Sequence, residues 1–248
     1  MDTPSTLRIA SWNIHKGFGL GNTRFLLDEM RQAIRLVDAD IVFLQEVVGE
    51  NHKHGHRVAN WVPEQFEYLA DEVWTHYAYG RNAIYEHGHH GNAILSKYPF
   101  SAWSQYDISI LPTSQRGLLH GVIAGGVHLI CVHMGLLGWE RMYQATCLAK
   151  FIGREVGNAP LIMAGDFNDW RHRVDKTLRQ RFGLKEAYHE KHGRLAATYP
   201  ARWPLFRMDR VYYRGVECVQ AERLSGEPWA ALSDHCALYA EFRLPDGE

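Results

Sequence analysis

The chain has 248 residues and a hydrophobic fraction of 46%, which is enough to build the core of one α/β domain, and we expect a single domain over residues 1–248. Its formal net charge of −1 at pH 7 excludes a global positive field that would hold a polyanion nonspecifically, so a nucleic acid would have to meet a local patch. The sequence has neither a signal-peptide pattern nor an apolar run of the roughly 20 residues that cross a bilayer. We therefore expect a cytoplasmic protein without a transmembrane segment, and we expect a monomer.

Short runs rich in β-branched and aromatic residues recur along the whole chain and predict strands. In chain order they cover residues 7–14, 41–46, 92–96, 121–124, 128–133, 160–165, 209–213 and 236–242. Apolar residues fall on one helical face between residues 25 and 37 and again between residues 139 and 152, which predicts two helices that cover sheet faces. An early β-α-β passage followed by mainly strand-to-strand connections predicts two packed sheets with outer helices rather than a doubly wound parallel sheet.

We expect loops at strand ends in four segments, which are residues 50–56, 86–91, 170–176 and 198–206. Loops in such positions are where functional sites are usually assembled. The cysteines have no CxxC spacing and mostly sit in apolar runs, so we expect buried free thiols at Cys131, Cys147, Cys218 and Cys236.

Several apolar strands end in polar side chains or are preceded by them. Polar residues are not expected at the ends of strands that run through a core unless they face a functional site. These residues are Asn13, Glu46, His133, Asp166, Asn168, Asp209, Asp234 and His235. Oxygen ligands of this kind suit a hard cation such as Mg²⁺ or Mn²⁺. The two histidines supply groups that titrate near neutral pH. The pattern therefore predicts a site that combines a divalent metal with acid–base chemistry.

The same residues belong to an ordered series of motifs that resembles the endonuclease/exonuclease/phosphatase superfamily, whose fold is that of DNase I. Each motif alone occurs by chance, but the series in this order is specific, and it extends from about residue 8 to residue 243. The motifs are Ser11-Trp-Asn, Leu44-Gln-Glu, Gly91-Asn-Ala-Ile-Leu-Ser, Val132-His, Gly165-Asp-Phe-Asn, Met208-Asp-Arg and Leu232-Ser-Asp-His. The chain also resembles a bacterial branch that carries Asn13-Ile-His-Lys-Gly and Gly80-Arg-Asn-Ala.

The resemblance implies a four-layer α/β/β/α sandwich with two packed, mainly antiparallel sheets, and hydrolysis of a phosphate ester. Carried over residue by residue, it implies that Glu46 is the principal ligand of Mg²⁺ or Mn²⁺. The resemblance also places Asn13 beside Glu46 at the metal, and it implies that Asp234 is a further metal ligand.

The resemblance also implies the residues that carry out the chemistry. His235 corresponds to a histidine that activates water or contacts the scissile phosphate, and Asp209 to the carboxylate that orients it. Asp166 and Asn168 correspond to residues that position the nucleophile and hold phosphoryl oxygens, while His133 is suited to protonating the leaving oxygen. Which group is the base and which is the acid stays open.

Three further residues complete the substrate-binding set that the resemblance implies. Arg116 falls where relatives have an arginine that grips the phosphate, and a guanidinium there would stabilise the negative charge of a five-coordinate phosphorus. Arg81 lies in a stretch reminiscent of a DNA-contacting loop, and Asn92 lies in the Gly91-Asn-Ala motif. His15 departs from the abasic-site endonucleases of the superfamily, which have an acidic residue at that place, and this argues against a base-excision-repair role.

Other interpretations of these residues stay open at the level of sequence. Glu46 and Asp166 are also suited to capping a turn or helix, and His133 could be a core histidine on the strand face of Val127, Leu129 and Cys131. The histidine runs at residues 52–56 and 87–90 suit solvated loops, although His89 or His90 could reach a substrate. Basic residues follow the Gly-Asp-Phe-Asn motif and could bind a second phosphate or begin a solvated helix. Trp203 and Phe206 could form a hydrophobic lip for bases or acyl chains, or anchor their loop inward.

The function that we expect first is a metal-dependent nuclease that cleaves DNA or RNA and leaves 5′-phosphate ends. The chief alternative is a phosphodiesterase or phosphatase for a phospholipid or a small phosphoester, which the near-neutral charge and the aromatic segment 203–206 would also fit. A third hypothesis, a non-catalytic binding scaffold, conflicts with the intact set of polar residues. The implied partner in both enzymatic cases is a phosphodiester substrate.

Overall fold

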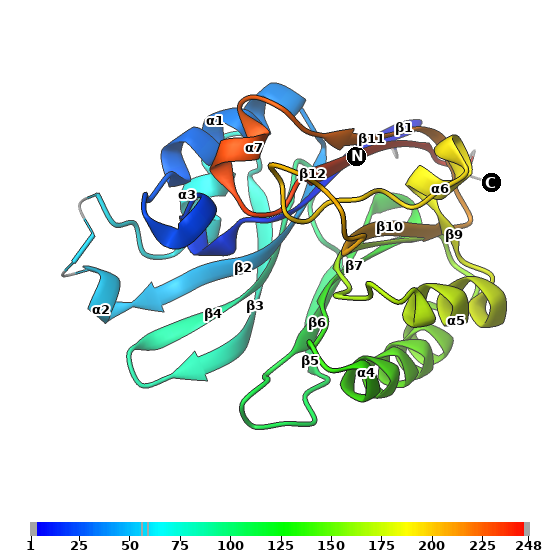
Figure 1. The fold of residues 1–248 in the computed structure, drawn as a ribbon. Helices are drawn as coiled ribbons and strands as arrows, with labels where there is room; N and C mark the ends of the chain where they lie inside the picture. Colours follow the sequence, from blue (N-terminus) through cyan, green and yellow to red (C-terminus); the bar gives the residue numbers. More distant parts are fainter. Residues whose placement is uncertain (1–3, 56, 59, 246–248) are drawn as a thin grey trace.

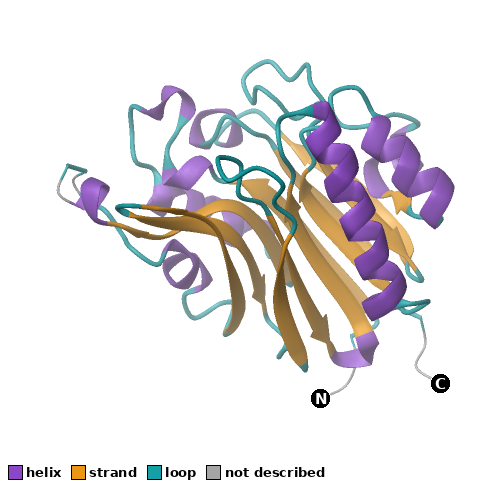
Figure 2. Ribbon diagram, turned by 90° about the horizontal axis from the view of Figure 1, so that it is seen from below, coloured by secondary structure: helices purple, strands orange, loops and turns teal. Residues whose placement is uncertain are grey.

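The computed structural model describes residues 4–55, 57–58 and 60–245 of the chain. Two six-stranded sheets pack face to face, with helices on their outer faces (Figure 1). In Figure 2 the strands form the middle of the molecule and helices flank them on either side. The predicted four-layer sandwich is confirmed.

In the first sheet, neighbouring strands are antiparallel except for β1 and β2, which are parallel. The order is β11 (Glu217–Leu224), β12 (Ala237–Arg243), β1 (Thr6–Asn13), β2 (Ile41–Asn51), β4 (Gly88–Ser96) and β3 (His76–Tyr85).

The second sheet repeats this design, because its only parallel neighbours among the described strands are β7 and β8. The order is β5 (Ala102–Asp107), β6 (Gly117–Ile123), β7 (Val127–His133), β8 (Leu161–Asp166), β10 (Asp209–Arg214) and β9 (Lys185–Glu186). Each parallel pair is joined by a helix, so the chain has a second β-α-β passage besides the early one that its sequence predicts.

The helices cover the sheets through their apolar faces. The first sheet is covered by α1 (Leu27–Val37), α3 (Gln65–Ala70) and α7 (Trp229–Leu232), and the second by α4 (Gly138–Phe151) and α5 (Arg173–Phe182). Shorter helical elements are α2 (His52–Gly55), α6 (Ala187–His192), η1 (His15–Gly17), η2 (Leu20–Asn22), η3 (Ala124–Gly126) and η4 (Ile152–Val156). None of the helices in the described part of the chain has the length and apolar character that crossing a membrane requires.

The central core lies between the two sheets, and alternation along the strands decides which residues enter it. Val127, Leu129 and Cys131 of β7 point into this core, as their spacing predicts. His133 continues the same alternation at the end of the strand, so its side chain emerges at the rim of the core. The four cysteines are free, and all but Cys147 are buried.

Two of the predicted loops are wrong, because strands β2, β4 and β3 extend together as a ribbon beyond the packed core. Asn51 of β2 pairs with Gly88 of β4, and α2 follows β2 directly. The predicted loop 50–56 is therefore strand and helix in its described part, and His56 lies outside the described residues. The predicted loop 86–91 becomes strand from Gly88 onward. Its histidines and glycines do not resemble a core strand because the ribbon is only partly buried.

The predicted loop at residues 198–206 is confirmed, and the one at residues 170–176 is confirmed in its first half. Residues 198–206 form an irregular segment with one bridge between Tyr199 and Phe206, whereas α5 begins at Arg173 and takes up the second half of segment 170–176. The strands that lack a sequence signal are β3, β5, β9 and β11. Each lies at or beside a sheet edge or is very short, and exposed positions interrupt its apolar pattern.

Replacing Gly165 of β8 by alanine should destabilise the protein strongly. Its φ is 148°, and a Cβ at this position would lie 1.9 Å from the carbonyl oxygen of Val132 on the neighbouring strand β7. We expect Gly165→Ala to lower the free energy of unfolding by about 2 kcal/mol or more in urea unfolding followed by circular dichroism. Gly153→Ala is the matched control, since nothing lies within 4 Å of the Cβ built at Gly153. Equal stability losses in the two variants would contradict the argument.

Candidate active site

The polar strand ends meet at one edge of the second sheet. Because β7 and β8 are parallel and end together, His133 stands beside Asp166 in the register. Strand β10 is antiparallel to β8 and begins there, which places Asp209 opposite Asp166. The segment before β12 adds His235 from the first sheet. Residues far apart in the sequence therefore share one site.

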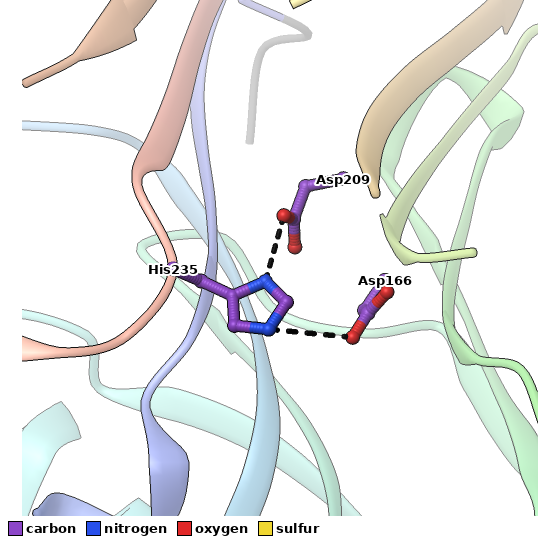
Figure 3. Close-up of side chains that lie close together, drawn as sticks. All are labelled: Asp166, Asp209 and His235. Carbon is purple, nitrogen blue, oxygen red and sulfur yellow. Dashed lines mark hydrogen bonds and ion pairs between the residues drawn. The ribbon is translucent and has the colours of Figure 1, made fainter. Parts of the chain in front are cut away.

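Asp209, His235 and Asp166 form the centre of this site (Figure 3). The Nδ1 atom of His235 lies 2.8 Å from Oδ2 of Asp209, a hydrogen bond that orients the ring. The Nε2 atom of His235 faces Asp166, at 3.8 Å from its Oδ2. The exposed fractions are 1% for Asp209, 2% for Asp166 and 7% for His235. The imidazole is thus held between two buried carboxyl groups.

Bonds from the first sheet fix the position of His235. The indole of Trp12 donates to its carbonyl oxygen at 2.9 Å, and its own backbone N–H donates to the hydroxyl of Ser233 at 3.2 Å. That hydroxyl donates to the carbonyl oxygen of Asn13 at 2.7 Å. Segment 233–235 is therefore tied to the end of β1.

The carboxyl group of Asp166 has three further neighbours. The side chain of Asn13 donates to its Oδ2 at 3.3 Å, and the backbone N–H of Asn168 donates to its Oδ1 at 2.9 Å. Nε2 of His133 lies 3.6 Å from Oδ2. Asn168 is in a left-handed conformation with φ 49°, and its side-chain amide donates to the carbonyl oxygen of Met134. The structure thus brings together Asn13, His133, Asp166, Asn168, Asp209 and His235.

Burial and neighbouring charge separate the protonation states of these groups. Burial and the negative charge of Asp209 raise the pKa of Asp166 to about 6, although the nearby His235 opposes this. Burial would lower the pKa of His235, but the charges of Asp209 and Asp166 outweigh it and raise the value to about 10. Burial, reinforced by the cation of Arg116, lowers the pKa of His133 well below its ordinary value. At neutral pH His235 is cationic and His133 is neutral.

Of the residues predicted as metal ligands, Asn13 contacts this centre, whereas Glu46 and Asp234 lie beside it. Glu46 sits at a bulge of β2 with φ 57°, and its Oε2 lies 3.3 Å from Nζ of Lys16. Burial would raise the pKa of Glu46, but charge interactions with His133, as it protonates at low pH, and with the ammonium of Lys16 outweigh it and lower the value to about 2. Asp234 lies 3.6 Å from Nδ1 of His15. Glu46 is thus an ionised carboxylate at neutral pH.

The donor set around the site fits a divalent cation. Ligand atoms of Asp166, Asp209 and His235 lie within 4.8 Å of one another, and among the described residues this is the one such group of three or more. Oδ1 of Asp209 and Nδ1 of His15 are buried without a hydrogen-bond partner in the described structure. Carboxylates with free acceptor atoms are the ligands that Mg²⁺ and Mn²⁺ prefer.

Besides Asn13, the residues predicted to bind substrate lie outside the central cluster. Asn92 is buried between the sheets, where its amide donates to the carbonyl oxygens of Gly117 and Cys131 at 3.1 and 3.4 Å. Arg116 and Arg81 both line a cleft of about 390 Å³ at the β3 and β5 edges. Arg116 also acts electrostatically on His133, whereas Arg81 is exposed and makes no contact with the central cluster among the described interactions.

The structure adds two residues to the neighbourhood that the sequence interpretation did not name. Lys16 reaches Glu46, and its left-handed φ of 59° is not visible in the sequence, although it belongs to the Asn-Ile-His-Lys-Gly motif. The hydroxyl of Thr198 is fully buried and accepts from the backbone N–H groups of Met208 and Asp209 at 3.3 and 3.1 Å. A buried threonine in a predicted loop is the only signal that could have indicated it.

Comparison with known proteins agrees with this geometry. Residues 10–235 match the Endonuclease/Exonuclease/phosphatase family. The chain belongs to this family. It is therefore a phosphoric ester hydrolase of a superfamily that depends on divalent metals.

Individual relatives share the whole length of the chain. The protein named Uncharacterized protein YbhP from Escherichia coli (strain K12) is 41% identical over 245 residues, which are 96% of this chain and 97% of that protein. The endonuclease/exonuclease/phosphatase from Beutenbergia cavernae DSM 12333 has a TM-score of 0.80 at 18% identity, over 98% of this chain and 73% of that chain. D. rerio TDP2 complexed with single strand DNA product has a TM-score of 0.73 at 20% identity, over 96% and 99%. These two solved structures show the same fold.

Removing the central imidazole should remove most of the turnover. We expect His235→Ala to lower kcat on bis(p-nitrophenyl) phosphate by about 10²–10⁴-fold, the usual contribution of a positioned acid or base. His87→Ala is the matched control, because His87 is exposed on the turn between β3 and β4. Circular dichroism checks that both variants are folded. A wild-type rate in His235→Ala would refute its assignment.

Proposed function

We propose that this enzyme hydrolyses a phosphodiester bond with the help of Mg²⁺ or Mn²⁺, giving a phosphomonoester and an alcohol. The observation that carries the proposal is the buried arrangement of Asp209, His235 and Asp166, in which a cationic imidazole stands between two carboxyl groups. The intact cluster also argues against a non-catalytic scaffold. Such a scaffold would have no use for two carboxyl groups buried opposite each other, since burying like charges together costs stability.

Glu46, with Asn13 and Asp234, is the set that would hold the metal, because the protonated His235 of the central group cannot act as a ligand. When bound, a divalent cation there polarises the phosphate and neutralises charge that develops on its oxygens. The low pKa of Glu46 supports this role, because the carboxylate needs no deprotonation before it can bind a cation. Lys16 now offsets part of that charge, so it would have to give way or turn to the substrate phosphate.

Asp166 is the better candidate for the general base. With its pKa near 6 it can accept a proton near neutral pH, whereas His235 is already protonated. Water attacks phosphorus in line with the leaving oxygen, its proton passes to Asp166, and the phosphorus–oxygen bond to the leaving group breaks. His235 supplies a proton to the leaving oxygen, and Asp209 stabilises its cationic form. Neutral His133 can donate a hydrogen bond to a phosphoryl oxygen, beside the guanidinium of Arg116.

Nucleic acid is the first candidate substrate, with 5′-phosphate products. The arginines 81 and 116 of the 390 Å³ cleft support it as contacts for backbone phosphates next to the scissile one. The similarity to TDP2, which was solved with a single-strand DNA product, supports it at the level of fold. A phospholipid is the second candidate, favoured by large apolar side chains exposed on loops that border the site.

Metal dependence can be tested directly. We expect EDTA to abolish turnover of bis(p-nitrophenyl) phosphate, and Mg²⁺ or Mn²⁺ in excess to restore it. Glu46→Gln should raise the dissociation constant for Mn²⁺ by about tenfold or more in isothermal titration calorimetry, since a neutral amide is a poorer ligand. Glu50→Gln is the control, because Glu50 lies half exposed on the same strand and pairs with His52 instead. Turnover that survives EDTA would overturn the metal-assisted mechanism.

The salt dependence of turnover discriminates between the two substrates. A polynucleotide held through several cations should lose kcat/KM steeply as NaCl rises from about 50 to 200 mM, because bound counterions are released on binding. Turnover of bis(p-nitrophenyl) phosphate in the same series is the control for ionic effects on the chemistry itself. If an oligonucleotide is not cleaved at low salt, or is cleaved with no more salt dependence than the control, the nuclease hypothesis fails.

A further inference from the structure

Large apolar side chains are exposed on three loops that begin or end at the catalytic strand ends, and at the start of α4. Trp203 and Leu205 are each 70% exposed, and Leu136 is 58% exposed. We call the whole set the apolar rim, and its members are Leu136, Leu137, Trp139, Trp170, Trp203, Leu205 and Phe206. Single exposed apolar residues are ordinary, but several of them on neighbouring loops beside a site mark an interaction surface.

The three loops are held against one another and against the site. The amide of Asn168 donates to the carbonyl oxygen of Met134, which joins the loop after β8 to the loop after β7. The guanidinium of Arg210 donates to the carbonyl oxygens of Asp169 and Arg207, which joins the loop after β8 to the segment before β10. The gold segment between α6 and β10 runs toward α7 (Figure 1), where Ala201 donates to the carbonyl oxygen of Asp234.

The rim has a fixed shape rather than a loose one. The guanidinium of Arg141 lies 4.4 Å over the ring of Trp170, and it donates to the carbonyl oxygens of Gly135 and Leu136. Leu136, Leu137 and Trp170 line a cleft of about 240 Å³ together with basic residues of the same loops. The apolar residues therefore stay exposed because their backbone is anchored, and they cannot fold back onto the protein without breaking these bonds.

The charged side chains that the three loops expose are cationic. Arg171, Arg173 and Arg202 are exposed. The acidic residues of these loops are buried and engaged: Asp169 accepts from the backbone N–H groups of Arg173 and Asp175, and Glu140 accepts from Gln144. The surface thus combines apolar residues with positive charge, although the whole chain has a net charge of −1.

We propose that the apolar rim docks on an anionic phospholipid bilayer and presents the site to phosphodiesters at the level of the headgroups. Tryptophans concentrate at the membrane–water interface, and arginines beside them attract anionic lipid. Leucines distinguish this surface from a nucleic-acid platform, because bases stack on aromatic rings and gain little from exposed aliphatic side chains. The inference rests on the proposed phosphodiesterase function for its substrate class, but docking itself needs no turnover.

The experiment measures co-sedimentation of the full chain with vesicles of phosphatidylcholine, with and without phosphatidylglycerol. EDTA is present, so that binding is recorded without hydrolysis. We expect binding to the anionic vesicles, and Trp203→Ser with Leu205→Ser should weaken it by about tenfold or more. Arg171→Gln and Arg202→Gln should each weaken it by about fivefold. The matched control is Trp103→Ser with Leu36→Ser, which removes an exposed tryptophan from β5 and an exposed leucine from α1 and should change nothing.

Three outcomes would overturn the docking proposal. The wild type could fail to sediment with anionic vesicles, the rim and control double variants could bind equally well, or the rim variant could lose affinity for single-stranded DNA while its vesicle binding is unchanged. Failure of the proposed function has a different signature. It would leave vesicle binding intact, with no turnover of bis(p-nitrophenyl) phosphate in Mn²⁺.

Discussion

The rest of the structure depends on two carboxyl groups that face each other inside the protein. Asp166 and Asp209 are paired in the register of β8 and β10, and both are almost fully buried. Two buried like charges are costly unless a cation or a shared proton compensates them. The imidazole of His235 supplies that compensation here, and it can do so only because the first sheet delivers it between them. The protonation states of the site therefore depend on the packing of the two sheets.

Backbone strain marks the same place. Glu46, Lys16 and Asn168 all have positive φ values between 49° and 59°, and Gly165 has φ 148°. Non-glycine residues adopt the left-handed region at a cost, and such residues persist where the surrounding structure determines them. Glu46 lies at a bulge of β2, Gly165 is the penultimate residue of β8, and Lys16 and Asn168 follow the ends of β1 and β8. All four therefore lie where a central strand reaches the site. Positive φ values also occur away from the site, as at Asp38 and Asp71, and the stability of the packed cores offsets their cost.

Sequence patterns could predict the layers and the central cluster because both follow from local rules. An apolar strand that ends in Asp or His is visible in the chain, and the order of the motifs specifies the family. The edge strands were not predictable, since exposed positions break their periodicity, as in β5 and β11. The sequence also could not predict that the polar residues divide into a central cluster around His235 and a flanking pair, Glu46 and Asp234. That division depends on which way Lys16 and His15 turn, and only the tertiary structure determines this.

Arg210 connects the chemistry to the surface that surrounds it. It follows Asp209 directly, is fully buried, and lies 3.5 Å from Asp169, which follows Asn168 in the neighbouring loop. Asp169 in turn caps the start of α5, and its loop carries Trp170 at the rim. A buried ion pair of this kind is a poor source of net stability, because desolvation consumes most of its Coulomb energy. Its effect is to fix positions, because it links the loop that holds Asn168 to the segment that leads to Asp209. A ligand that displaces the apolar rim would therefore also displace these two catalytic segments.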